Sequence, residues 1–240
     1  MPLALREDEG VNGSVVRPGR TEQLLEVSVF LFLIVPSMVL SFFAVKQGSL
    51  SFVLVAFAVI LRDLALVSLI LFFVWRNGEP VMRIGWTFRK IWNEIRLGIA
   101  LFIPCFLVTG LIENGLRAVG LSAPSKPLPS FLAARGPVEL LLALALVVII
   151  AVAEETIFRG YLLLRFRTII VSPPLAALMS AVVFSLGHGY EGSAGVISVG
   201  FMGLVFAFIY LWRQSLVAPI VMHFLQDFIG IVLLPLLGKG

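Results

Sequence analysis

Charged residues are scarce in this chain of 240 residues. They make up 13% of the sequence, whereas hydrophobic residues make up 60%. A soluble domain has about 25% charged and about 45 to 50% apolar residues. The mean hydropathy is +1.06, so the chain has far more apolar side chain than one core can bury. A soluble protein is excluded, and much of the surface must face lipid.

Cysteine and histidine are scarcer still. The single cysteine, Cys105, lies in an apolar run, which excludes an internal disulfide and a thiolate metal cluster. The chain has two histidines, His188 and His223, and a net charge of +4. In a membrane protein such a basic excess sets orientation. We therefore expect no nucleic-acid partner.

The sequence also lacks internal repeats, and we expect no cleavable leader. Many secondary transporters carry inverted repeats, so their absence weighs against a transporter. Residues 1–23 are polar and mixed in charge, with no short apolar segment followed by a small-residue cleavage site. We expect a polar tail over residues 1–23 and an uncleaved first span.

Long apolar runs fill the rest of the chain. A transmembrane helix needs about 20 apolar residues, and seven runs approach or exceed this length. The sequence therefore predicts an all-α, polytopic transmembrane helix bundle with about seven spans, between six and eight, in a membrane domain over residues 24–240. The runs cover residues 24–45, 50–75, 97–118, 137–164, 173–189, 194–212 and 215–236.

Basic residues predict the orientation. They concentrate between the second and third runs, directly after the fourth run and directly after the sixth. Basic loops stay in the cytoplasm, so the N-terminus is expected to be cytoplasmic. From the compact chain we expect a prokaryotic inner membrane.

Ionisable residues within spans are costly and indicate function. Three of them, Glu154, His188 and His223, lie at about 17, 23 and 15 Å from the cytoplasmic face when each residue adds about 1.5 Å. This similar depth permits one site built from three helices. The complete set is Arg62, Asp63, Glu154, Glu155, Arg159, His188, His223 and Asp227.

Helical spacing separates these residues into groups. Glu155 and Arg159 are four residues apart and can form an ion pair, whereas Glu154 points about 100° away from Glu155 and is left to face a cavity. His223 and Asp227 are also four residues apart, so the carboxylate can orient the imidazole.

A second charged group, Arg62 and Asp63, has adjacent positions in the sequence. Adjacent residues of a helix do not face one another. We therefore expect a structural role, with a separate partner for each.

Three motifs resemble those of a known family. They are E-E-T-I-F-R from Glu154 to Arg159, F-S-L-G-H from Phe184 to His188, and H-F-L-Q-D from His223 to Asp227. In this order they resemble the motifs of the CAAX-protease and bacteriocin-processing family, with a family-like core over about residues 137–236.

The resemblance implies an intramembrane endopeptidase that acts on a membrane-associated or lipidated protein or peptide within the lipid. It implies that Glu154 activates water with help from His188 and that His223 and Asp227 stabilise the oxyanion. From their spacing, Glu155 and Arg159 are expected to support the site as an ion pair. No cofactor is expected.

Asp227 departs from this pattern. Prenyl-protein proteases of the family usually carry an amide at this position, and an ionised acid cannot donate to an oxyanion. A zinc-dependent protease is one alternative, since Glu154, His188, His223 and Asp227 form a possible mixed ligand set for Zn²⁺. A proton-coupled transporter or a membrane scaffold would also use buried acids and histidines.

Overall fold

A computed structural model describes residues 19–46, 51–123, 134–170 and 172–237, and the statements below concern these residues. They form helices, with no strand among them, as the sequence predicts. The elements are α1 (Arg20–Lys46), α2 (Phe52–Arg76), η1 (Val81–Ile84), α3 (Ile91–Ala118), α4 (Gly136–Glu155), η3 (Thr156–Leu162), α5 (Leu163–Ile170), α6 (Pro173–Leu186), η4 (Gly189–Glu191), α7 (Gly192–Arg213), α8 (Val217–Asp227), η5 (Phe228–Leu233) and α9 (Leu234–Leu236).

Six helical stretches are long and apolar enough to cross a membrane. Two of them are composite, because α4, η3 and α5 run on as Gly136–Ile170, and α8, η5 and α9 run on as Val217–Leu236. The remaining apolar run, 173–189, forms α6, which has 14 residues. At about 1.5 Å per residue it is shorter than the bilayer core of about 30 Å. The predicted polytopic bundle is confirmed, with six long helices and one short one.

Local sequence explains where several helices begin. Ser51 precedes α2, and its side chain accepts a hydrogen bond from the backbone N–H of Leu54 at 3.3 Å, as N-cap residues do. Proline occupies the first turn of α4 and of α6, where its missing N–H costs nothing. The predicted polar tail over residues 1–23 lies mostly outside the described residues.

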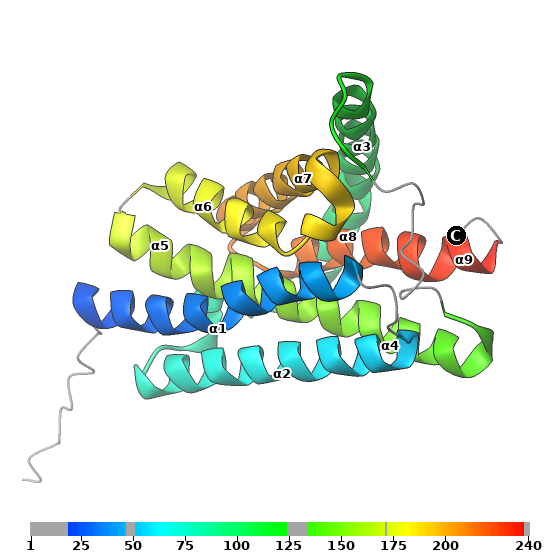
Figure 1. Ribbon diagram of the computed structural model, residues 1–240. Coiled ribbons are helices and arrows are strands. Elements are labelled where there is room, and N and C mark those ends of the chain that lie inside the picture. Colours follow the sequence, from blue (N-terminus) through cyan, green and yellow to red (C-terminus); the bar gives the residue numbers. More distant parts are fainter. Residues whose placement is uncertain (1–18, 47–50, 124–133, 171, 238–240) are drawn as a thin grey trace, which may run out of the picture.

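The helices pack in a pattern that brings distant segments together. Helix α2 runs alongside α4, α3 packs against α7 and α8, and α6 packs against α7 (Figure 1). Helix α4 also contacts α8. The E-E motif on α4 therefore lies between the charged segment of α2 and the histidine of α8.

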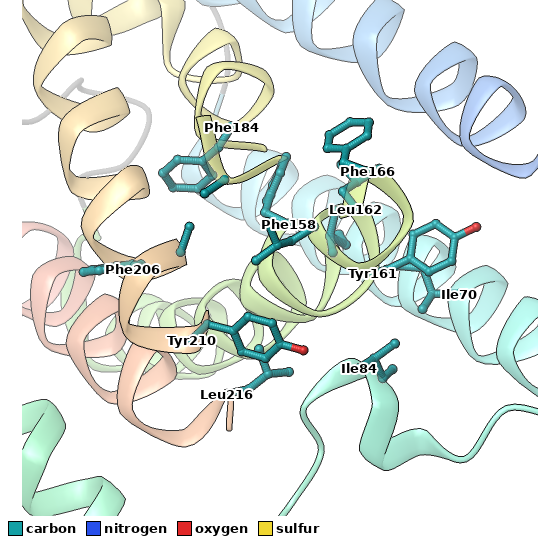
Figure 2. Packing of buried hydrophobic residues seen from close by; sticks show 14 of the residues in the cluster. Ile70, Ile84, Phe158, Tyr161, Leu162, Phe166, Phe184, Phe206, Tyr210 and Leu216 are labelled. Carbon is teal, nitrogen blue, oxygen red and sulfur yellow. The ribbon is translucent and has the colours of Figure 1, made fainter. Parts of the chain in front are cut away.

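Aromatic side chains form the core in the middle of the bundle. Phe158 and Phe184 meet edge to face with ring centroids 5.1 Å apart, and Phe206 lies on the other side of Phe184 (Figure 2). On the outer surface, large apolar side chains such as Phe32 and Leu111 are more than 70% exposed. Such a surface suits contact with lipid tails.

Ion pairs join several segments at one end of the bundle. The buried Arg165 contacts Oε2 of Glu79 at 2.6 Å, and Glu79 also binds Arg83 at 2.6 Å. The adjacent Gly85 carbonyl accepts a hydrogen bond from the backbone N–H of Leu216 at 3.1 Å. The three basic segments thus share one end of the bundle, and the side of the membrane to which that end belongs stays a prediction.

Candidate active site

A cavity of about 170 Å³ lies among helices from both halves of the chain. All four residues that the sequence nominates as catalytic line it, together with Arg62 and Tyr190, which it does not nominate. The other walls are apolar or aromatic. The lining residues are Met38, Val55, Val59, Arg62, Ile150, Glu154, Phe158, Phe184, Gly187, His188, Tyr190, His223, Asp227 and Ile231.

Glu154 presents its carboxylate to this cavity. Its Oε1 lies 3.9 Å from Nη2 of Arg62, and its Oε2 lies 3.8 Å from Nε2 of His223. Both distances are too long for a hydrogen bond. Oε2 is buried and has no hydrogen-bond partner in the described part of the chain. The Glu154 side chain as a whole is 15% exposed and lines the cavity, so its carboxylate is an acceptor that no described residue occupies.

Glu155 points the other way, into the packed interior. Its Oε1 accepts from Nη1 of Arg159 at 2.8 Å, which is the ion pair expected from their spacing. Both side chains are at most 1% exposed. The Arg159 guanidinium also donates to the Gly203 carbonyl at 3.2 Å and lies 4.3 Å from the Phe184 ring centroid. The guanidinium that pairs with Glu155 is thus fixed by several contacts.

His223 is fixed by Glu155. Its Nδ1 lies 2.8 Å from Oε1 of Glu155, so Nδ1 carries a proton and donates it to the carboxylate. Nε2 then faces the cavity, 3.8 Å from Glu154 and 3.5 Å from Oδ2 of Asp227. The sequence-based expectation gave the orienting role to Asp227, whereas the shorter contact is with Glu155. That contact arises from the packing of α4 against α8, which spacing within one helix does not reveal.

His188 lies just beyond α6, where the chain turns into η4. Its Nδ1 is 3.2 Å from the Phe184 carbonyl, and a carbonyl only accepts, so Nδ1 is the protonated nitrogen. This leaves Nε2 to accept. The Phe184 ring lies 4.9 Å from the His188 ring and 5.9 Å from the His223 ring. One aromatic side chain therefore contacts both histidines.

Two π-helical segments begin directly after site residues. The segment η3 follows Glu155, and η5 follows Asp227. Such segments are rare and occur often at functional sites, because the wider turn redirects the side chains beside it. Neither was predicted, since no residue type marks a π-turn.

Arg62 and Asp63 correct the expectation that each needs its own partner. Nε of Arg62 donates to Oδ1 of Asp63 at 2.8 Å, and Nη2 lies 2.8 Å from the same oxygen. The arginine side chain is long enough to bend back and reach its neighbour, although adjacent positions of a helix point in different directions. Asp63 is fully buried, while Arg62 lines the cavity. The signal that could have identified Arg62 is its charge within a span.

The site has more acidic than basic groups. Four carboxylates, on Asp63, Glu154, Glu155 and Asp227, accompany two guanidinium groups, on Arg62 and Arg159. Neutrality therefore requires about two further positive charges, supplied by protons or by a cation. Among the described residues, no group of three or more His, Cys, Asp and Glu side chains is arranged to hold a metal ion.

The comparison with protein families bears on this site. The model of the family described as type II CAAX prenyl endopeptidase Rce1-like matches residues 136–229, less than half of the chain. The resemblance inferred from the three motifs is confirmed. The matched segment runs from the start of α4 into η5 and contains Glu154, His188, His223 and Asp227, but not Arg62. The match and the six apolar helices support an integral membrane protease of the CAAX type. Searches of curated proteins and of solved structures found no match.

Proposed function

We propose that this protein is an intramembrane endopeptidase in which Glu154 activates the water that hydrolyses a peptide bond. The observation that carries the proposal is the Glu154 carboxylate, which lines the cavity with its side chain 15% exposed and makes no hydrogen bond to the described residues. A carboxylate oxygen in that position can accept a proton from water. Catalysis of this kind requires no serine or cysteine nucleophile.

The proposed reaction has two proton transfers. Glu154 takes a proton from water while the hydroxyl oxygen attacks the peptide carbonyl carbon. The tetrahedral intermediate then collapses, the C–N bond breaks, and Glu154 returns the proton to the leaving nitrogen. Glu154 and His223 both line the cavity and approach one another to 3.8 Å, so a water in the cavity can lie beside both side chains.

The histidines support this reaction in different ways. His188 accepts a hydrogen bond from the water through Nε2, because its Nδ1 donates to Phe184. His223 holds Nε2 toward the reacting carbonyl oxygen, because its Nδ1 is bound by Glu155. When Nε2 is protonated it donates to the developing oxyanion.

The substrate we propose is a membrane-associated protein or peptide. The apolar cavity walls include Val55, Val59 and Ile150, which suit an apolar side chain next to the cleaved bond. We further propose that membrane lipid surrounds the bundle, that the protein resides in a prokaryotic inner membrane, and that its N-terminus is cytoplasmic.

The test is cleavage of a quenched peptide library by the purified protein in lipid vesicles. Glu154→Gln keeps the shape of the side chain but removes its ability to take a proton, so we expect a folded protein without turnover. The control is Glu113→Gln, because Glu113 pairs with Arg117 away from the cavity. Equal turnover by wild type and Glu154→Gln would overturn the proposal.

A zinc-dependent protease built from the same residues is the second candidate. The observation that favours it is the excess of carboxylates, since a divalent cation would neutralise two of them. In that enzyme Glu154, His188, His223 and Asp227 would be ligands. Measurement of bound zinc and of the effect of chelators on turnover separates the two candidates.

A further inference from the structure

Arg62 is a charged hydrogen-bond donor in the cavity wall, outside the segment matched by the protease family. It lies in the middle of α2, where a charged side chain in lipid is costly. Its side chain is 34% exposed, whereas that of its partner Asp63 is not exposed. The pair is thus arranged with the acid buried and the guanidinium facing the cavity.

The hydrogen bonds of this pair leave donors available. Nε and Nη2 of Arg62 both approach Oδ1 of Asp63 at 2.8 Å. A guanidinium has five N–H donors, so those of Nη1 are not used by Asp63. Asp63 therefore fixes the direction of the arginine without using all of its donors.

The position of Arg62 relative to Glu154 matters for the reaction. Nη2 of Arg62 is 3.9 Å from Oε1 of Glu154, and His223 approaches the other oxygen. A peptide carbonyl attacked by water at Glu154 must lie close to that carboxylate. The oxygen of that peptide carbonyl then lies within reach of the Arg62 guanidinium.

The other polar side chains of the cavity are uncharged or conditional donors, and Tyr190 has a single uncharged O–H. Asp227, when ionised, only accepts hydrogen bonds, and His223 donates through Nε2 only when it is protonated on both nitrogens. Arg62 is charged at every working pH. A preorganised charged donor is the group that stabilises an oxyanion most.

We infer that Arg62 is a catalytic residue that donates to the oxyanion of the tetrahedral intermediate, with Asp63 as its positioning residue. The inference rests on the proposed function and adds a residue of α2 to the site. Arg62 then contributes to the transition state more than to substrate binding. Its removal should lower kcat and leave KM unchanged.

The experiment compares variants of the Arg62–Asp63 pair on a peptide that the wild type cleaves. Arg62→Gln combined with Asp63→Asn removes both charges together, so no unpaired buried charge remains. We expect kcat to fall about 10²- to 10³-fold with KM unchanged, the effect typical of losing one oxyanion donor. The control is Arg117→Gln combined with Glu113→Gln, which neutralises an ion pair on α3 away from the cavity and should leave kcat unchanged.

Arg62→Lys keeps the charge and the pairing with Asp63, so it provides a test if the neutral pair does not fold. Lysine lacks the fork that reaches Asp63 and a second oxygen together. We expect a smaller fall in kcat than in the neutral pair, again without a change in KM. A rise in KM alone, or a wild-type kcat in both folded variants, would overturn the inference.

Adding Asp227→Asn to the neutral pair separates a donor role from a structural one. The amide introduces an N–H donor at the cavity wall, so we expect it to restore part of the lost kcat. Failure of restoration would count against the donor role. Glu154→Gln tests the proposed function independently: if that variant is inactive while the Arg62 variants keep wild-type kcat, the proposed function stands and only the role of Arg62 is wrong.

Discussion

Oε1 of Glu155 lies 2.8 Å from Nδ1 of His223 and accepts a second hydrogen bond from Arg159 at the same distance. One oxygen on α4 thus joins the charge inside η3 to the imidazole of α8. Hydrogen bonding at one ring nitrogen determines what the other can do. Glu155 therefore sets the orientation of His223 as well as neutralising Arg159.

Glu155→Gln is the first prediction. The neutral amide leaves Arg159 buried without a charged partner, so the free energy of unfolding should fall by about 3 to 5 kcal/mol. The turnover of the folded fraction should also fall, because the neutral amide oxygen is a weaker acceptor for Nδ1 of His223 than the carboxylate. Thermal unfolding in detergent and kcat in vesicles measure the two effects.

The control for this prediction is Glu113→Gln, which breaks an exposed pair on α3 and should change stability by no more than about 0.5 kcal/mol. Glu154→Gln should remain as stable as the wild type, since Glu154 has no close partner. If Glu155→Gln unfolds at the wild-type temperature and only Glu154→Gln is less stable, the assignment of the two glutamates is reversed.

The sequence predicted which residues line the cavity better than it predicted their contacts. Glu154, His188 and His223 were identifiable because ionisable side chains are rare in apolar spans, and their depth along three helices indicated that they could meet. Spacing within one helix also gave the Glu155–Arg159 pair. These conclusions need only the rise and turn of a helix.

The missing parts depend on packing between helices and on side-chain conformation. The contact from Glu155 to His223 exists because α4 lies against α8, and helix spacing contains no information about that. Arg62 bends back onto Asp63, which depends on its rotamer. The apolar run 173–189 was read as a span, but its helix ends at Leu186, because hydropathy does not register the turn before His188.

Gly203 gives the second prediction. A Cβ at this position would lie 2.9 Å from Cδ1 of Phe184 and 3.2 Å from Nη2 of Arg159. Phe184 is buried and cannot move away freely, so Gly203→Ala should lower the free energy of unfolding by about 1 to 3 kcal/mol. The same contact should displace Arg159 and reduce turnover.

A matched control for the Gly203 variant is Gly110→Ala. A Cβ at Gly110 meets nothing within 4 Å, so this substitution within α3 should leave stability unchanged or raise it by about 0.5 to 1 kcal/mol. Thermal unfolding of both variants checks the difference. Equal stability of the two variants would contradict the close approach of α6 and α7 at Gly203.

Glu79 gives the third prediction. It binds Arg165 through two hydrogen bonds, at 3.0 and 2.6 Å, at the end of the bundle that lacks the cavity. Glu79→Gln should lower the free energy of unfolding by about 2 kcal/mol, the value of a buried charged hydrogen bond. Because the cluster does not line the cavity, the kcat of the folded fraction should stay at the wild-type value.

Glu22→Gln is the comparison for Glu79, since Glu22 is exposed and its Oε2 accepts a hydrogen bond from the backbone N–H of Gly19. Its unfolding temperature should match the wild type. A large loss of kcat in folded Glu79→Gln would show that the end of the bundle is coupled to the site.

The last prediction concerns Asp227, where the two candidate mechanisms differ most. Its Oδ2 is 3.5 Å from Nε2 of His223, too far for a strong hydrogen bond. In the glutamate mechanism an amide can replace it, because an amide both accepts from His223 and donates toward the oxyanion. We therefore expect Asp227→Asn to keep substantial kcat, and chelators to have little effect on the wild type.

In the zinc mechanism the same carboxylate is a ligand, and a neutral amide weakens the site while preserving its shape. Activity should then collapse and return in part with added Zn²⁺. Turnover of Asp227→Asn, zinc content of the purified wild type and turnover after chelation decide between them: an inactive variant together with stoichiometric zinc and loss of activity on chelation would replace Glu154 as general base by a metal centre at the same residues.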